Sequence, residues 1–208
     1  MKEPIIWCAD IGSIKNKKFG WCRGIQIEDE FKFITGTDIG EFAKGIANDL
    51  SVGNKVAIGF ECPLFIPISD NPLHLTSARQ GEGDRAWSAG AGCGALATGL
   101  TESVWILSKI KESSEVEIFP TFGWEKFRKG LANLFIWEAF VSKDSKVQTH
   151  SGDAKVAVRA FLRGYPNIVE ANAVIADNPY NLVAAALLRA GLTKNIDLLS
   201  QACIVIRS

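Results

Sequence analysis

Short runs of apolar residues in the first part of the chain predict an antiparallel meander. Residues 4–10 and 19–27 have the composition of strands and are joined by a basic turn at 12–18. A third strand is predicted over residues 30–35, which follow the second strand closely enough to form a hairpin with it. We expect these three strands to be neighbours in one sheet.

A helix and a buried strand are predicted next. Apolar residues recur at helical spacing from Ile39 to Leu50, and Thr37 or Asp38 precedes them as the N-cap. Residues 55–60, which are apolar from Val56 to Phe60, predict a strand that is covered on both faces. Because parallel strands need a crossover connection, this helix indicates that the sheet is mixed.

The remainder of the chain combines one long polar segment with further regular elements. Residues 61–94 form a loop whose length is typical of functional segments. Helices are predicted over 95–111, 134–141, 153–163 and 178–192, and strands over 116–120 and 202–207. No repeat or linker divides the chain. We therefore expect residues 1–208 to form one α/β domain, with a mixed five-stranded sheet and helices on both faces.

The composition indicates which classes of protein this chain can belong to. The 208 residues are 47% hydrophobic, and 23 basic residues balance 23 acidic ones, so any nucleic-acid-binding surface must be local. Five scattered cysteines without a C-x-x-C pair are typical of reduced thiols. With no signal peptide and no apolar run of membrane-spanning length, we expect a cytoplasmic protein that does not bind membranes.

Three acidic residues lie at the ends of predicted strands or at the start of a predicted helix. Asp10 ends the first strand, Glu61 ends the strand at 55–60, and Asp177 begins the last predicted helix. Carboxylates that converge at one sheet edge repel one another unless a cation lies between them, and oxygen ligands favour Mg²⁺ or Mn²⁺. Such a site can catalyse phosphodiester hydrolysis. The structural alternative is that Asp177 caps a helix and Asp10 turns the chain.

The polar loop contains candidates for substrate binding. Arg79 and Arg85 can bind phosphate bidentately, and Trp87 can stack on a base. Alternatively, the loop satisfies itself, with either arginine paired to Glu82 or Asp84. Outside the loop, Lys15 can add positive charge near Asp10, although a solvated turn is the commoner role of such a residue.

Several motifs together resemble a known family. They are FECPLFIP at 60–67, R-x-x-E-G-D-R-A-W-S at 79–88, VEIFPTFGWEKF at 116–127, HSGDAKVAVRAF at 150–161 and NPYNLVAAALL at 178–188. The chain resembles, over nearly its whole length, the domain of unknown function 429 family, whose members are predicted ribonuclease H-like nucleases. The placement of Asp10 and Glu61 is also similar to that of Holliday-junction resolvases. The resemblance implies a ribonuclease H-like fold, a nucleic-acid substrate and a metal-dependent nuclease activity.

The chain departs from the family pattern at two positions. Glu61 stands where the family commonly has aspartate, and Asn181 stands where it tends to have an acid. Asp153 is a further acidic candidate for the site. Two alternatives to a nuclease therefore remain: a non-catalytic module that binds a nucleotide or a protein, and a relative of actin-like small-molecule kinases, whose phosphate turn Asp10-Ile-Gly-Ser resembles.

Overall fold

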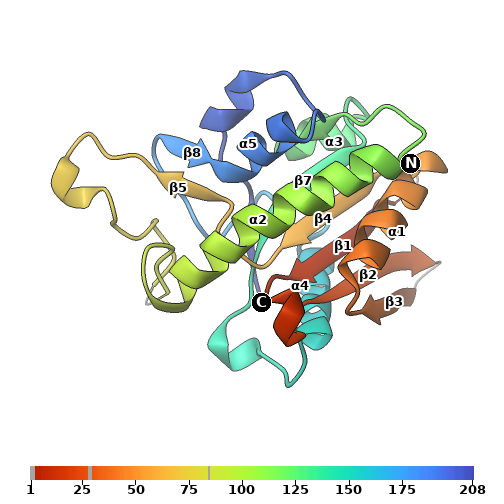
Figure 1. The fold of residues 1–208 in the computed structure, drawn as a ribbon, viewed down its shortest axis with the longest axis horizontal. Coiled ribbons are helices and arrows are strands. Elements are labelled where there is room, and N and C mark those ends of the chain that lie inside the picture. Colours follow the sequence, from red (N-terminus) through yellow and green to blue (C-terminus); the bar gives the residue numbers. More distant parts are fainter. Residues whose placement is uncertain (1–2, 28–29, 84) are drawn as a thin grey trace.

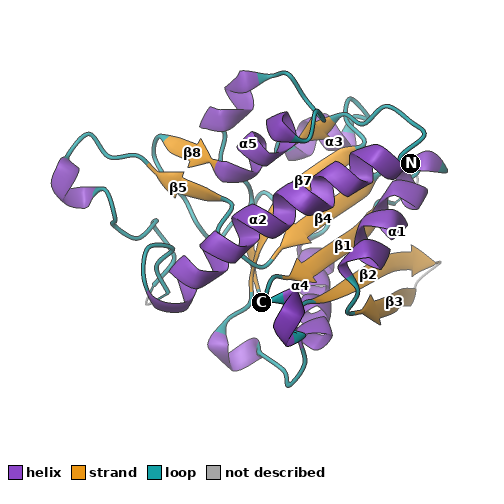
Figure 2. Cartoon of the chain, in the orientation of Figure 1, coloured by secondary structure: helices purple, strands orange, loops and turns teal. Residues whose placement is uncertain are grey.

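A twisted mixed sheet forms the centre of the computed structural model, which describes residues 3–27, 30–83 and 85–208 (Figures 1 and 2). The strands are β1 (Ile5–Asp10), β2 (Gly20–Ile27), β3 (Glu30–Gly36), β4 (Val56–Phe60), β5 (Phe65–Pro67), β6 (Pro120–Thr121), β7 (Leu134–Phe140), β8 (Pro179–Asn181) and β9 (Val205–Arg207). The helices are α1 (Ile39–Ser51), α2 (Gly90–Ser113), α3 (Trp124–Arg128), α4 (His150–Gly164) and α5 (Leu182–Arg189).

The sheet changes from antiparallel to parallel in its middle. Seven strands have the order β3-β2-β1-β4-β7-β6, with β9 pairing along β7. The meander β1-β2-β3 is antiparallel, as the sequence predicts, whereas β4 runs parallel to β1, and β7 runs parallel to β4. The carboxyl ends of β1, β4 and β7 therefore lie at one edge of the sheet. A separate pair, β5 and β8, is antiparallel.

Helices cover both faces of the sheet, as expected, and the alternation of side chains along β1 separates two cores. Ile5 and Trp7 point to the face covered by α1, α2 and α5. Ile6 and Cys8 point to the opposite face, which α3 and α4 cover (Figure 1). Because successive strand residues point to opposite faces, Asp10 shares the side of Ile6 and Cys8, where α4 lies.

The sheet has seven strands rather than the expected five, and one of the additional strands is formed by residues 134–140, which were expected to be helical. They form β7, in which every residue from Leu134 to Ala139 is buried. A central strand covered on both faces has no polar side, so its sequence shows no period-two pattern that would distinguish it from a buried helix. The predicted strand at 116–120 is reduced to β6, which begins only at Pro120.

Helix α1 is confirmed, with Asp38 as its N-cap: the Asp38 carboxylate accepts the Glu41 N–H at 2.8 Å. The last helix begins later than predicted. Residues 179–181 pair with β5 as β8, and Asn181, not Asp177, caps α5 by accepting the Ala184 N–H at 2.8 Å. The interpretation of Asp177 as the start of this helix is therefore wrong.

Two further expectations can be compared with the described residues. All five cysteines are free thiols, and Cys93 alone among them is exposed. Within the described ranges, none of the helices combines the length and the apolar character needed to cross a membrane.

Candidate metal centre

Asp10 and Glu61 meet at the carboxyl edge of the parallel strands. Asp10 is the last residue of β1, and Glu61 directly follows β4. The Glu61 N–H donates to the Ala9 carbonyl at 2.8 Å, which extends the β1–β4 pairing by one step and brings the two acidic residues side by side. Asp10 is 4% exposed, so its carboxylate is largely removed from bulk water.

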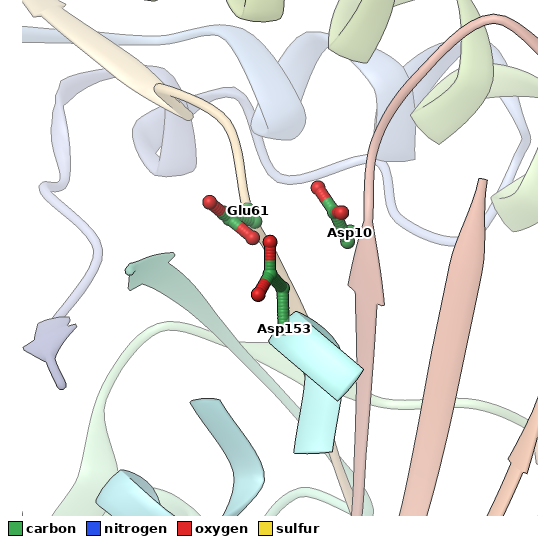
Figure 3. A group of neighbouring side chains, drawn as sticks. All are labelled: Asp10, Glu61 and Asp153. Carbon is green, nitrogen blue, oxygen red and sulfur yellow. The ribbon is translucent and has the colours of Figure 1, made fainter. Parts of the chain in front are cut away.

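Asp153, in the first turn of α4, completes the cluster. One carboxylate oxygen each of Asp10, Glu61 and Asp153 lies within 4.8 Å of the other two (Figure 3). The cluster is thus built from two strand ends and one helix, and in Figure 3 the carboxylates of Glu61 and Asp153 face each other. Three carboxylates at this spacing form an all-oxygen set that suits a hard divalent cation.

A glycine in β2 allows α4 to come close enough to the sheet. Gly20 pairs with Asp10 across the β1–β2 ladder. A Cβ atom at Gly20 would lie 2.2 Å from the Ser151 nitrogen, in the first turn of α4. The missing side chain therefore lets the helix start next to Asp10, with Asp153 pointing to the cluster.

Lys146 places a positive charge among these carboxylates. Its Nζ lies 3.2 Å from Glu61 Oε1 and 3.5 Å from Asp153 Oδ2. The segment between β7 and α4, which carries Lys146, also holds Asp153 in place, because the Val147 N–H donates to Asp153 Oδ1 at 2.7 Å. Glu61 Oε2 is buried and has no hydrogen-bond partner among the described residues. A buried carboxylate oxygen without a donor is costly, and a bound cation would satisfy it.

His150 extends the cluster toward solvent. Its Nδ1 lies 2.6 Å from Asp10 Oδ2, and its side chain is 41% exposed. Because Nδ1 is engaged by Asp10, the other ring nitrogen is left to exchange protons with a bound molecule or with water.

Two carboxyl groups of the cluster, those of Glu61 and Asp10, hold their protons more tightly than isolated carboxyl groups do. Burial, together with the charge of Asp10, raises the pKa of Glu61 to about 8, against the lowering effect of Lys146. Burial likewise raises the pKa of Asp10 to about 6, while Lys146 and a hydrogen bond with Glu61 act in the opposite direction. Burial lowers the pKa of Lys146, but Glu61 and Asp10 outweigh it and the net shift is upward. The site is therefore short of positive charge.

Glu102 of α2 is a further buried acid near the cluster. It is 8% exposed, and burial raises the pKa of its carboxyl group to about 7, although a hydrogen bond from the backbone of Gly12 lowers it. Its negative charge also raises the pKa of Asp10. Glu102 thus attaches α2 to the turn that follows Asp10.

Asp177 does not join this group. It is exposed in the loop before β8 and lines a different cavity, together with Ile68, His74 and Gln80. The physical reason is topological. The chain reaches the carboxyl edge of β1 and β4 through the start of α4, whereas the β5–β8 pairing keeps the residues just before Pro179 away from that edge. Asp153 occupies the place expected for Asp177.

Arg79 is not available to a substrate. Its guanidinium group is buried and donates to Glu82 and to both carboxylate oxygens of Glu138, the latter at 2.8 and 2.6 Å. It also lies over the ring of Phe65. The alternative in which the loop satisfies itself is therefore correct for Arg79, which joins the loop to β7.

The other three candidates for substrate binding, Arg85, Trp87 and Lys15, lie in different environments. Arg85 is partly buried in the cavity beside the cluster and donates to the Val141 carbonyl at 2.6 Å. Trp87 donates through its ring nitrogen to the Ser77 carbonyl at 2.9 Å, which ties it to the loop. Lys15 is exposed in the turn after β1. Asp84, the alternative partner of Arg85, lies outside the described residues.

A cavity of about 150 Å³ adjoins the carboxylates. Asp10, Glu61 and Lys146 line one part of it. The rest of its lining includes Arg85, Glu138, Phe140, Val141 and the first turns of α2. A small polar group that reaches the carboxylates can therefore occupy a space bordered by both signs of charge.

Sequence reasoning missed the roles of Lys146 and His150 and named Asp153 only as a further candidate. A usable signal exists for Asp153. It lies on the apolar side of α4, four residues before Ala157 and eight before Phe161, all of them buried. A buried acid on the apolar face of an amphipathic helix requires a partner or a cation. Lys146 gives no such signal, because it lies in a loop.

Removing the Lys146 charge is expected to tighten metal binding. In Lys146→Met, the half-saturating concentration of Mn²⁺ should fall about tenfold, which corresponds to about 1.4 kcal/mol. The ammonium group both repels a cation and contacts two of its ligands. Metal titration followed by the midpoint of thermal unfolding measures the effect, and Lys109→Met on the exposed side of α2 is the control. Weaker binding in Lys146→Met would mean that the lysine supports the site.

Comparisons of the chain with protein-family models, curated proteins and solved structures find no match.

Proposed function

We propose that this protein is a metal-dependent phosphodiesterase that cleaves nucleic acid on a ribonuclease H-like fold. The observation that carries the proposal is the convergence of Asp10, Glu61 and Asp153 within 4.8 Å. The family resemblance likewise implies an acid on the first strand and one on the fourth, but it implies the third at the start of the C-terminal helix, whereas Asp153 lies in α4. The antiparallel meander followed by parallel crossovers supports the same fold.

The residues fit a divalent cation. Asp10, Glu61 and Asp153 would hold Mg²⁺ or Mn²⁺, and the partnerless Glu61 Oε2 is an available ligand atom among the described residues. When bound, such an ion lowers the pKa of water and stabilises negative charge on a phosphoryl oxygen. Lys146 would leave the carboxylates and neutralise part of the charge on the phosphodiester. His150, oriented by Asp10 at 2.6 Å, would transfer a proton through its other ring nitrogen.

Cleavage assays with a pair of isosteric variants test the proposal. Wild-type protein should cleave labelled DNA or RNA oligonucleotides, single-stranded, duplex or branched, with Mn²⁺ or Mg²⁺ and not with EDTA. Asp153→Asn should lower the rate by about 100-fold or more, because loss of one charge-stabilising group in an active site costs about that much. Asp177→Asn removes an exposed aspartate that lies in another cavity and should retain the wild-type rate.

Two results would contradict the nuclease proposal. One is the absence of cleavage by the wild-type protein with any divalent ion. The other is equal cleavage by the wild-type and Asp153→Asn proteins, which would attribute the activity to a contaminant or to another site.

A further inference from the structure

Two arginines lie on one aromatic ring beside the metal centre. The guanidinium carbon of Arg85 lies 5.6 Å from the centre of the Phe140 ring, and that of Arg207 lies 4.5 Å from it. The three residues come from the polar loop, the end of β9 and the end of β7. Contacts between a guanidinium group and an aromatic ring restrict the side chains, so these two positive charges are held as neighbours.

The charge of this arginine pair, Arg85 and Arg207, is not neutralised by the described part of the chain. Arg85 donates to the Val141 carbonyl and Arg207 to the Gly81 carbonyl, and both acceptors are uncharged. Within residues 3–27, 30–83 and 85–208, neither arginine has a carboxylate at ion-pair distance. By contrast, Arg23 and Arg79 are each paired with acidic residues. Each of the pair keeps further N–H donors, since guanidinium has five.

The arginine pair adjoins the carboxylates. Arg85, Phe140 and Val141 line the same cavity as Asp10, Glu61 and Lys146. Arg207 continues this edge outward, because it is exposed and packs on Phe140. The surface therefore runs from an acidic cluster that suits a cation to a basic group that suits an anion. In a strand with several phosphates, one phosphate can contact the cation while a neighbouring phosphate contacts the arginines.

We infer that Arg85 and Arg207 bind backbone phosphates adjacent to the phosphodiester at the metal centre. The substrate would then be a strand with several phosphates, not a mononucleotide or a small ester. This inference rests on the proposed function. Arginine binds phosphate bidentately, and contacts to the backbone alone do not read the sequence. Binding through this subsite is accordingly independent of base sequence and sensitive to salt.

Direct binding measurements test the subsite without requiring cleavage. Fluorescence anisotropy of a labelled single strand of about 12 nucleotides is recorded in EDTA at several NaCl concentrations. Arg85→Gln and Arg207→Gln should each weaken binding about tenfold at low salt. Each should also lower the slope of log affinity against log salt by about 0.7, the value for one phosphate contact on a single strand.

The control is Arg128→Gln, which removes one partly exposed arginine from another part of the surface. Arg128 lies at the opposite end of β4 from Glu61: Lys55, just before β4, donates from its Nζ to the Arg128 carbonyl at 3.3 Å. This variant should bind the strand as the wild-type protein does. Unchanged affinity and salt slope in both Arg85→Gln and Arg207→Gln would overturn the inference, as would equal losses in Arg128→Gln.

A second measurement separates the inference from the proposed function. The ratio of kcat/KM for the same single strand to that for bis(p-nitrophenyl) phosphate should fall about tenfold in the two variants, through KM of the strand. Cleavage by the wild-type protein with no change in this ratio would overturn the subsite and leave the nuclease intact. Arginine-dependent binding without any cleavage would overturn the nuclease activity and support the phosphate-binding surface.

Discussion

Arg79→Met is expected to destabilise the protein by about 3–5 kcal/mol, the usual cost of removing one partner of a buried ion pair. Both Glu82 and Glu138 are buried and receive their charged hydrogen bonds from Arg79. Methionine fills much of the volume but leaves two carboxylates without a cation. The free energy of unfolding, measured by urea denaturation at neutral pH, tests this expectation.

Two comparisons identify the cause of the destabilisation. Lys109→Met removes a cation from an exposed pair with Glu112 and should change the free energy of unfolding by about 0.5 kcal/mol or less. Adding Glu138→Gln to Arg79→Met should recover part of the loss, because it removes one of the unpaired charges. If the single and double variants were equally unstable, loss of packing against Phe65 would be the better explanation.

Glu61→Gln is expected to stabilise the metal-free protein at pH 8 and to abolish its stabilisation by Mg²⁺ or Mn²⁺. The raised pKa values of Glu61 and Asp10 mean that the folded state holds protons that the unfolded state has already released. The contribution of Glu61 to stability is complete below its ordinary pKa of 4.5 and is lost as the pH rises through about 8. That of Asp10 is complete below its ordinary pKa of 3.8 and is lost as the pH rises through about 6. The metal-free wild-type protein should therefore become less stable between about pH 5 and pH 8.

A bound cation reverses this dependence, because it binds the deprotonated carboxylates. At about 100 times the dissociation constant, the ion should add about 2.7 kcal/mol to the wild-type protein, and more of this gain should appear at the higher pH. The amide side chain introduced by Glu61→Gln cannot ionise, so this variant should show a weaker pH dependence and no gain from the ion. The measurement is the urea midpoint of unfolding, recorded with EDTA and with excess ion, at about pH 5 and at about pH 8.

The control for this experiment is Glu112→Gln, which removes an exposed carboxylate of α2. It should keep both the pH dependence and the gain from the ion. If Glu61→Gln were instead less stable than the wild-type protein in EDTA at the higher pH, the Glu61–Lys146 ion pair would outweigh repulsion among the carboxylates. The site would then not be short of positive charge.

Local sequence patterns were sufficient for much of the fold. The meander, α1 with its Asp38 cap and α4 each carry their own periodicity and capping residues, so each can be identified without knowing its neighbours. Asp10 and Glu61 were identifiable for a similar reason. Each ends an apolar strand, and a carboxylate there needs a partner whatever the rest of the chain does.

Other parts were decided only by tertiary structure. Strand β7 is apolar throughout most of its length because helices cover both of its faces, and this burial erases the alternation by which a strand is recognised. Arg79 and Arg85 are close in the loop and alike in type, yet Glu138 of β7 engages the first and leaves the second in the cavity. No local pattern contains that distinction, since it depends on a contact between residues 59 positions apart.

The third carboxylate of the cluster also shows what can be read from the sequence and what depends on the tertiary structure. The sequence by itself determined that several acidic residues at element ends required an explanation, and it supplied Asp10, Glu61, Asp153 and Asp177 as candidates. Which helix delivers the third carboxylate was settled by packing: Gly20 lets α4 approach β1, and the β5–β8 pairing leaves Asp177 on the surface. Convergence of side chains is a property of the assembled sheet, because the distances between elements exist only once the chain has folded.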